Sequence, residues 1–250
     1  MGPTLVVAPH PDDEVLGCSA VLHQSSVTVV HVTDGVPPWT ASDARAEIRS
    51  ARRTESARAW QALSCTARAL PLGFGDLVAW QAVEEVCECL CEVIAAAGAA
   101  RVFLPAYQRG HPDHDASYLA GAMAHDRLPD DPERTWWVYG LYGFDPERRL
   151  RFGWLPPDPY GSSETRGGDD LLGVKGQALR QFASQVWPGS ALDRWLREPT
   201  AERFAPLPVQ WDALPAVPSF YDEELRFGRH GASLAVVESA FQQVLAARAS

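Results

Sequence analysis

The chain has 250 residues, of which 46% are hydrophobic, and its 32 acidic and 22 basic residues give a formal net charge of −10. A chain of this length and composition can bury a substantial core, in one large α/β domain or two small ones. The acidic balance offers no basic footprint for phosphate backbones or anionic lipid. Neither nucleic acid nor a membrane surface is therefore expected as a partner.

No segment predicts export or insertion into a membrane. The first residues, Met-Gly-Pro-Thr, run directly into the apolar residues 5–8 without the cationic stretch of a signal peptide. No apolar run approaches the ~20 residues of a membrane span. The five cysteines contain no C-x-x-C pair, which predicts reduced thiols rather than a metal cage. We expect a soluble, cytoplasmic protein.

Apolar, β-branched runs alternate with longer helical patterns over the first 145 residues. The runs that predict buried strands are residues 4–8, 27–33, 101–104 and 136–142. The segments that predict helices are residues 42–63, 81–97 and 115–127. Thr40-x-x-Asp43 resembles a capping box at the start of the first of these helices. Repeated strand-then-helix units predict an α/β fold with a Rossmann-like, doubly wound, mostly parallel sheet and helices on both faces.

The chain beyond about residue 145 is richer in Pro, Gly and aromatic residues and shows no second sheet. Residues 171–185 predict a helix, and Leu234, Val237, Phe241 and Val244 form an apolar stripe on a C-terminal helix. This stripe favours packing on the chain's own core, although a homo-oligomer stays open. We predict one domain with an irregular extension: residues 1–205 as the catalytic unit, and residues 206–250 as a Pro-rich segment and helix packed on it.

Polar residues follow three of the predicted strands, at residues 10–14, 33–35 and 107–114. Ligands of open parallel sheets bind in the crevice outside the carboxyl ends of the strands. The three segments therefore predict a binding or catalytic site at one rim of the sheet.

Residues 8–14, Ala-Pro-His-Pro-Asp-Asp-Glu, place an imidazole and two carboxylates after a buried strand. Asp12 and Asp13 are adjacent and must point different ways, so one can join His10 on a metal while the other faces the metal-bound water. Residues 111–114, His-Pro-Asp-His, bring a further imidazole from another strand end. Either cluster alone also fits a solvated helix start or a histidine that binds nothing. Together they have the composition of a catalytic zinc site.

These two segments resemble the LmbE/PIG-L family of zinc-dependent N-acetylglucosaminyl deacetylases. Further matching pieces are Gly17, residues 33–35, Arg52-x-x-Glu55, residues 175–185 and Glu202-Arg203-Phe204. The resemblance covers roughly the first four-fifths of the chain. It implies a metal-dependent amidohydrolase that uses one Zn²⁺, or another divalent metal, to remove an N-acetyl group from an amino-sugar-containing small molecule.

The resemblance also implies a role for each residue of the two clusters. His10, Asp13 and His114 would be the zinc ligands, and Asp12 would be the general base that activates a zinc-bound water. His111 would polarise the amide carbonyl, stabilise the oxyanion and protonate the leaving amine.

Outside these five residues the resemblance implies supporting roles. Arg52 and Asp76 match positions that contact sugar hydroxyls or polar groups of the substrate. For Arg52 the alternative is a weak surface pair with Glu55 on the same helix. Asp113 would orient a neighbouring imidazole, or would simply be a surface carboxylate after proline.

The sequence departs from the thiol-biosynthesis members of the family at one position. Those members carry a tyrosine two residues before the first histidine of the second cluster, where this chain has Arg109. Tyr107 is the nearest upstream tyrosine, and Arg109 could instead recognise a substrate anion. Trp39 and Trp80 follow loops near the predicted crevice, and Trp39 is the better candidate for an exposed rim residue.

Several activities remain open at this point. The leading hypothesis is hydrolysis of an N-acyl group, most simply acetyl, from an amino sugar. The alternatives are an amidase acting on a thiol conjugate or an acylated natural-product glycoside, and a non-catalytic metal- or sugar-binding protein. A nucleotide-binding site is weak because no G-x-G-x-x-G follows the first predicted strand.

Overall fold

The structure is a computed structural model that describes residues 2–24, 26–208, 214, 217–221 and 231–249. The strands are β1 (Thr4–Ala8), β2 (Val27–Thr33), β3 (Ala67–Phe74), β4 (Arg101–Pro105), β5 (Thr135–Tyr139), β6 (Tyr142–Phe144), β7 (Leu150–Phe152), β8 (Glu164–Arg166) and β9 (Glu202–Pro206). The helices are α1 (Asp13–Leu22), α2 (Arg45–Ala62), the 3₁₀ turn η1 (Ala79–Gln81), α3 (Val83–Ala97), α4 (Pro112–Arg127), α5 (Pro157–Tyr160), α6 (Asp169–Leu179), α7 (Ala191–Arg197) and α9 (Leu234–Ala249).

Within the described residues the main sheet has seven strands in the order β3-β2-β1-β4-β5-β9-β8. The first five strands of this order pair in parallel, whereas β9 runs antiparallel to β5 and β8 antiparallel to β9. The chain order reverses beside β1, so the carboxyl ends of β1 and β4 flank the switch point where such sheets bind ligands. The predicted doubly wound, mostly parallel α/β fold is confirmed.

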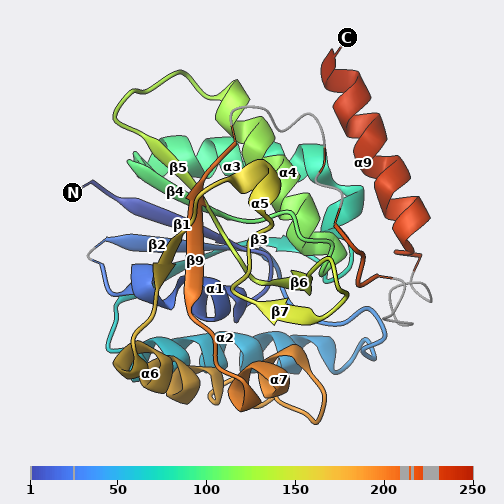
Figure 1. Ribbon diagram of the computed structural model, residues 1–250. Helices are drawn as coiled ribbons and strands as arrows, with labels where there is room; N and C mark the ends of the chain where they lie inside the picture. The colour runs from blue at the N-terminus through green and yellow to red at the C-terminus, as the bar shows by residue number, and fades with distance from the viewer. Residues whose placement is uncertain (1, 25, 209–213, 215–216, 222–230, 250) are drawn as a thin grey trace.

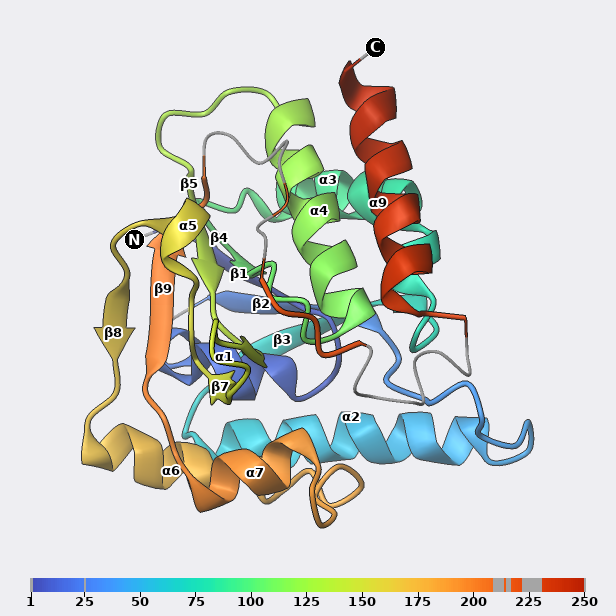
Figure 2. The same cartoon turned by 45° about the vertical axis from the view of Figure 1, so that its right-hand side comes forward.

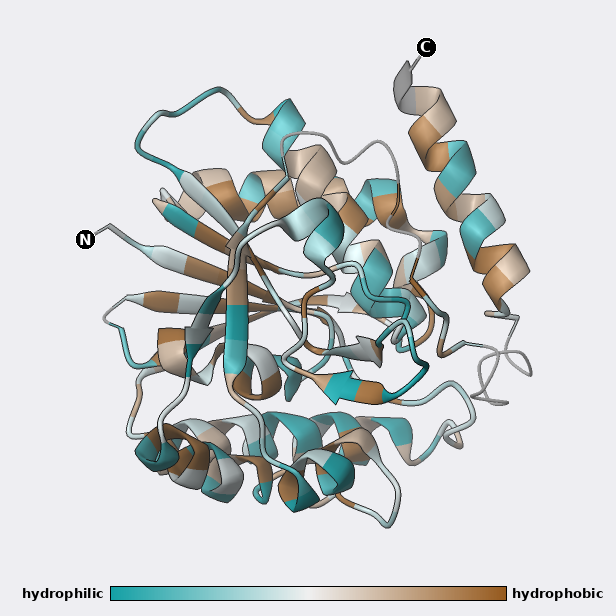
Figure 3. Cartoon of the chain, viewed as in Figure 1, coloured by the Kyte–Doolittle hydropathy of each residue, from teal (hydrophilic) through white to brown (hydrophobic). Residues whose placement is uncertain are grey.

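Helices cover both faces of the sheet (Figures 1 and 2). Helices α3, α4 and α9 lie on one face, and α1, α2, α6 and α7 lie on the other. The strands at the centre carry hydrophobic segments, whereas the long helix α2 is largely hydrophilic (Figure 3). Every residue of β1 is buried because both faces of this central strand are covered.

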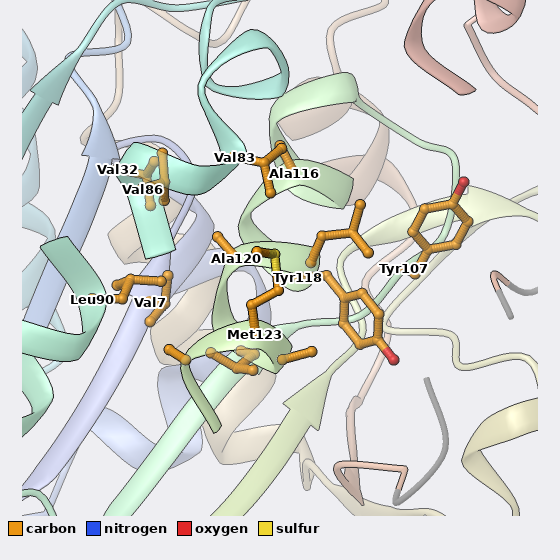
Figure 4. Packing of buried hydrophobic residues seen from close by; sticks show 14 of the residues in the cluster. Val7, Val32, Val83, Val86, Leu90, Tyr107, Ala116, Tyr118, Ala120 and Met123 are labelled. Carbon is orange, nitrogen blue, oxygen red and sulfur yellow. The ribbon is translucent and has the colours of Figure 1, made fainter. Parts of the chain in front are cut away.

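The core on the α3/α4 face is built by small and branched side chains that interdigitate (Figure 4). Val7 and Val32 project from the sheet towards Val86 and Leu90 of α3. Helix α4 packs closely against β4, since a Cβ at Gly121 would lie 2.5 Å from a methyl group of Leu104. This packing fixes the start of α4, which carries the second histidine cluster.

The C-terminal helix α9 joins this same core. Val237 and Phe241 are fully buried in it, and Leu234 and Val244 pack against it at the edge. The apolar stripe of α9 therefore faces the chain's own core. Among the described residues, no helix has the length and apolar character needed to cross a bilayer.

Several element boundaries differ from the sequence prediction. Helix α2 begins at Arg45, and its N-cap Ala44 makes no side-chain capping bond, so the Thr40-x-x-Asp43 capping box is wrong. The strand predicted over residues 136–142 breaks at Gly140, where a Cβ would lie 2.6 Å from the carbonyl oxygen of Trp154. The helix predicted over residues 171–185 ends at Leu179, which leaves Ser184 in a loop.

Two strand pairs escaped the sequence prediction. β6 and β7 form a separate two-stranded sheet, and β8 and β9 extend the main sheet in antiparallel sense. These strands have only three to five residues, and β7, β8 and β9 carry charged side chains, so all four lack the long apolar pattern of a buried parallel strand.

A buried ion pair fastens α1 to the far end of the chain. Helix α1 is interrupted at Cys18. Beyond the interruption, the Glu202 carboxylate accepts hydrogen bonds from the backbone N–H groups of Ser19 (2.8 Å) and Ala20 (2.9 Å). Lys175 Nζ donates to Glu202 at 2.9 Å and to the carbonyl oxygen of residue 16 at 2.5 Å. Both charged side chains are 1% exposed. The Glu202-Arg203-Phe204 motif therefore braces the helix that begins at the site.

Candidate metal and catalytic site

A cavity of about 620 Å³ opens at the carboxyl ends of the parallel strands. Part of its polar lining comes from the β1–α1 segment, from the β4–α4 segment, from α2 and from the turn after β3. The members of this part are His10, Asp12, Asp13, Arg52, Asp76, His111 and His114. The structure thus brings together all seven residues predicted from the sequence.

Three side-chain atoms at the base of the cavity form a nearly equilateral triangle. His10 Nδ1 lies 3.1 Å from Asp13 Oδ2 and 3.3 Å from His114 Nε2, and His114 Nε2 lies 3.2 Å from Asp13 Oδ2. Zinc with bonds of 2.0–2.1 Å at tetrahedral angles separates its ligand atoms by about 3.3–3.4 Å. The triangle therefore matches one face of a zinc tetrahedron, and its nitrogen and oxygen donors suit that ion.

Two other groupings around His10 could also hold a metal ion. His10, His111 and His114 bring ligand atoms within 4.8 Å of one another, as do His10, Asp76 and Asp113. The triangle of His10, Asp13 and His114 differs from both in that all three of its separations match those expected of tetrahedral zinc ligands.

The opposite nitrogen of His10 faces two carboxylates. His10 Nε2 lies 3.3 Å from Asp76 Oδ1 and 3.4 Å from Asp113 Oδ2, and Asp113 Oδ2 also accepts the backbone N–H of Leu77 at 2.7 Å. Burial disfavours protonation of His10, but hydrogen bonds to Asp113, Asp13 and Asp76 raise its pKa well above the usual range. Metal-binding histidines commonly donate their second N–H to a carboxylate in this way. Asp76 thus lines the cavity and also contacts His10.

Asp13 is held in its ionised form. Burial alone would raise its pKa, but the imidazoles of His114 and His10 outweigh burial and hold the pKa well below the usual range. The backbone N–H of His10 also donates to Asp13 Oδ2 at 3.0 Å. The carboxylate is therefore an anionic donor, as a cation requires.

Asp12 occupies a strained backbone position between His10 and Asp13. Its φ of 146° lies in a region that favours glycine, and such strain is concentrated at functional sites. Asp12 is the N-cap of α1. Burial raises the pKa of Asp12 to about 8. The positive charge of Arg52 lowers this pKa, and the negative charge of Asp13 raises it, but burial has the largest effect. A carboxyl with a pKa near neutrality is suited to proton transfer.

Arg52 reaches the site from α2. Its Nη2 donates to the carbonyl oxygen of Pro11 at 2.6 Å and lies 3.4 Å from Asp12 Oδ2. Glu55 turns elsewhere and accepts both the N–H and the hydroxyl of Ser184. The surface pair between Arg52 and Glu55 is therefore absent, because both side chains are buried with separate partners.

Gly35 makes room for Arg52. It has a φ of +61°, and a Cβ there would lie 2.9 Å from Nη2 of Arg52. This close approach explains the glycine in the Thr33-Asp34-Gly35 segment.

His111 is the N-cap of α4. Its Nδ1 accepts the backbone N–H of Asp113 at 3.2 Å, so the proton of a neutral imidazole lies on Nε2. The His111 ring stands edge-on to His10, with centroids 4.5 Å apart. His111 therefore brings an N–H donor to the cavity beside the metal triangle.

Arg109 does not serve as an anion receptor in this structure. Its guanidinium donates to the carbonyl oxygen of Val217 at 2.8 Å and pairs with Glu238 of α9, which corrects the interpretation of a substrate-facing arginine. Tyr107 is fully buried in the core. The tyrosine that lines the cavity is Tyr142, whose ring centroid lies 5.2 Å from that of His114.

The sequence reasoning missed the part of the cavity contributed by late segments. Tyr142, Ser184, Trp187, Leu192 and Phe220 all line it. They come from a short strand, from α7 and from loops, and apart from Ser184 they lie outside the motifs identified in the sequence. Trp39 lines the cavity and is 49% exposed, as predicted, whereas Trp80 is buried and donates to the carbonyl oxygen of residue 77.

The fold and site define an α/β protein with a buried imidazole–carboxylate cluster at the carboxyl ends of a parallel sheet. Residues 5–125 match the family profile described as PIG-L, GlcNAc-PI de-N-acetylase. This match, over nearly half of the chain, bears out the resemblance to the PIG-L (LmbE-like) deacetylases that the sequence motifs predicted. No curated protein sequence shows a significant match.

Solved structures show the same fold. Teicoplanin deacetylase Orf2, in a zinc-inhibited form, is 20% identical with a TM-score of 0.58, and the match covers 82% of this chain and 97% of that one. The A40926 pseudoaglycone deacetylase Dbv21 is 21% identical with a TM-score of 0.59, over 83% and 98% of the two chains. N,N'-diacetylchitobiose deacetylase from Pyrococcus horikoshii is 21% identical with a TM-score of 0.56, over 88% of each chain.

Proposed function

We propose that this protein is a metal-dependent N-deacetylase that hydrolyses an N-acyl group, most simply acetyl, from an amino-sugar-containing small molecule. The observation that carries the proposal is the triangle of His10, Asp13 and His114 with the Asp12 carboxyl beside it. The family match and the sugar-directed deacetylases among the structural neighbours support the same activity. The free, reduced cysteines are consistent with a cytoplasmic protein.

His10, Asp13 and His114 would hold one Zn²⁺ or a related divalent ion. When bound, such an ion supplies a Lewis acid that polarises an amide carbonyl and makes water acidic enough to ionise near neutral pH. Asp113 and Asp76 contact Nε2 of His10, opposite the nitrogen that faces the triangle, and so orient the ring. The anionic Asp13 would balance part of the charge of the ion. All three donors line the cavity, so an ion that they held would be accessible to a substrate there, as a catalytic zinc ion must be.

Asp12 and His111 would carry the proton transfers. Asp12 takes a proton from the attacking water as the new C–O bond forms, and Arg52 beside it fixes the carboxylate. His111 Nε2–H donates a hydrogen bond to the carbonyl oxygen as negative charge develops there. The C–N bond then breaks as the proton taken up by Asp12 passes to the departing nitrogen. The products are a carboxylate and a free amine.

Asp76 and Arg52 lie at the cavity wall where they can also meet sugar hydroxyls. Asp76 has a partly exposed side chain, which suits it to hydrogen bonding with a hydroxyl while it contacts His10. Arg52 is almost fully buried and faces Asp12 and Pro11. We therefore assign substrate contact chiefly to Asp76 and assign Arg52 chiefly to positioning of the β1–α1 turn.

The test is amine release from an N-acetylglucosaminide by protein purified with its metal, compared with chelated protein. Asp12→Asn is expected to keep the bound metal and to lose at least about 100-fold in kcat, the usual size of a general-base contribution. Asp170→Asn, at an exposed position in the first turn of α6, is the matched control and should retain full activity. Full activity after removal of the metal would contradict the proposal.

A further inference from the structure

The first turn of α1 contains a buried carboxylate that the proposed chemistry does not use. Glu14 is 0% exposed, although glutamate is rarely found fully buried without partners. Both of its carboxylate oxygens accept hydrogen bonds: Oε2 from the backbone N–H of Asp12 at 3.0 Å, and Oε1 from the indole N–H of Trp60 at 3.0 Å. These two bonds join the backbone of Asp12, the proposed general base, to helix α2.

The hydrogen bond to Asp12 lies at the strained backbone position. Asp12 is the N-cap of α1, and the N–H groups at the start of a helix have no partner within that helix. In a capping box a side chain of the first turn reaches back to the N-cap N–H, and Glu14 does this from the second helical position. A backbone with a φ of 146° persists only where its surroundings fix it. Glu14 supplies one of the contacts that fix it.

Two backbone carbonyl groups of the same turn are held from β2 and α2. Thr33 donates its backbone N–H and its hydroxyl to the carbonyl oxygen of Pro9, each at 2.9 Å. Arg52 donates to the carbonyl oxygen of Pro11 at 2.6 Å. Glu14 holds the backbone N–H that follows these carbonyls. A change at Glu14 therefore frees one group of the turn while the carbonyls keep their partners.

Glu14 is itself fixed from β2 and α2. Besides the bond from Trp60, its Oε2 lies 3.4 Å from Nε2 of His31. The rings of His31 and Trp60 stack with their centroids 6.2 Å apart, and both residues are buried. A side chain that is locked by packing and by hydrogen bonds can hold a neighbouring functional residue in one geometry.

The metal-facing carboxylate next to Glu14 has separate contacts. Asp13 Oδ2 accepts the backbone N–H of His10 at 3.0 Å, and the backbone N–H of Asp13 donates to the carbonyl oxygen of His10 at 3.2 Å. The hydrogen bonds of Glu14 go to Asp12 and Trp60 instead. A change at Glu14 should therefore act on the base and spare the metal ligands.

We propose that Glu14 is a positioning residue that holds the Asp12 backbone so that the Asp12 carboxyl stays aligned with the attacking water. This inference rests on the proposed deacetylase function and adds a residue to its machinery. Glu14 does not line the cavity, so it acts through Asp12 and does not touch substrate. A general base must lie within hydrogen-bond reach of the proton that it takes, and a shift of about 1 Å can cost about 100-fold in rate. Loss of the Glu14 bond should therefore appear in kcat and leave KM unchanged.

The experiment is a double-variant cycle with the zinc-loaded protein and methyl N-trifluoroacetylglucosaminide, whose activated amide keeps slow variants measurable. Glu14→Met fills similar space without an acceptor oxygen, and kcat should fall about 10–100-fold while KM and the zinc content per chain stay unchanged. In the Asp12→Gly background the same change should lower the residual kcat by no more than about twofold, because the carboxyl that Glu14 positions is gone. A residue that merely stabilised the fold would lower kcat equally in both backgrounds.

Two further variants complete the set. Glu14→Asp keeps the charge and shortens the side chain by one methylene, which withdraws the acceptor from the Asp12 N–H, and it carries the same cycle if Glu14→Met does not fold. Glu55→Met is the matched control, because Glu55 is also buried and accepts two hydrogen bonds, both from Ser184. The control should lose stability in thermal unfolding and keep kcat within about twofold of the wild type.

The outcomes separate the inference from the proposed function. Equal losses of kcat in the wild-type and Asp12→Gly backgrounds would overturn the inference and leave the deacetylase function standing. So would an unchanged kcat in the folded Glu14 variant, loss of its zinc, or an equal loss of kcat in Glu55→Met. Absence of amine release by the unmodified protein would overturn the proposed function itself, on which the inference rests.

Discussion

The buried Lys175–Glu202 pair gives a stability prediction that can be worked from the structure. Both side chains are 1% exposed, and Glu202 accepts two backbone N–H groups of α1 in addition to the Lys175 ammonium. Glu202→Gln removes the carboxylate charge and leaves Lys175 buried without a counter-charge. Breaking a buried pair in this way typically costs about 3–5 kcal/mol. We expect a loss of that size in the free energy of unfolding.

Urea denaturation, followed by tryptophan fluorescence, measures this loss. Glu164→Gln is a matched control, since Glu164 pairs with Arg166 at the surface where a salt bridge contributes at most about 1 kcal/mol. A double variant, Lys175→Met with Glu202→Gln, should recover part of the loss because no unpaired charge stays buried. A Glu202→Gln protein within about 1 kcal/mol of the wild type would refute the reasoning.

Three further predictions concern the site and the thiols. Asp113→Asn leaves His10 without one of its carboxylate partners, and we expect metal affinity to fall about 10–100-fold in a competition titration with a chelating dye. Gly35→Ala places a Cβ against the Arg52 guanidinium at a positive φ, and should cost about 1–3 kcal/mol in chemical denaturation and lower kcat. Burial raises the pKa of Cys87 to about 12, with Cys91 adding to the shift, and burial raises the pKa of Cys18 well above its usual range. Both thiols bind their protons more tightly in the folded state, so at pH 8 they should react with a disulfide reagent only after unfolding, as mass spectrometry of labelled peptides would show.

Each of these three has an outcome that would count against it. Unchanged metal affinity in Asp113→Asn would show that the His10 contact is incidental. A Gly35→Ala protein as stable as the wild type would mean that Arg52 moves aside freely. Rapid labelling of Cys18 in the folded protein would contradict its complete burial within α1.

The sequence predicted that His10, Asp13 and His114 come together, because they lie in two short segments that each follow a buried strand. His10 and Asp13 are separated by one turn of chain, and the parallel pairing of β1 with β4 carries His114 to the same edge of the sheet. The carboxyl ends of parallel strands lie at the same edge of the sheet, so locating the apolar runs was sufficient to predict that the two segments lie close together.

The supporting contacts could not be read from the sequence, because they join residues that are distant along the chain and carry no periodic pattern. Glu202 reaches Ser19 across 183 positions, and Arg109 reaches Glu238 across 129. The sequence marked Arg109 only as a departure from a family tyrosine. Its actual partners are Glu238 of α9 and the carbonyl oxygen of Val217, and the positions of both depend on tertiary packing.

The local errors have a similar origin. Thr40 and Asp43 have the residue types of a capping box, but α2 begins two residues after Asp43, and its N-cap makes no side-chain bond. Gly140 ends β5 because the backbone of residues 153–154 approaches it closely. Neither the start of α2 nor the end of β5 has a signal in the local sequence, since tertiary contacts determine both boundaries.

The central claim is that His10, Asp13 and His114 hold the catalytic metal. Its most direct test is a crystal structure of the metal-loaded protein with anomalous data at the zinc edge. The account predicts one zinc peak per chain, with His10 Nδ1, Asp13 Oδ2 and His114 Nε2 at about 2.0–2.2 Å. A metal held instead by His10, Asp76 and Asp113, or the absence of a peak at the triangle in active protein, would contradict it.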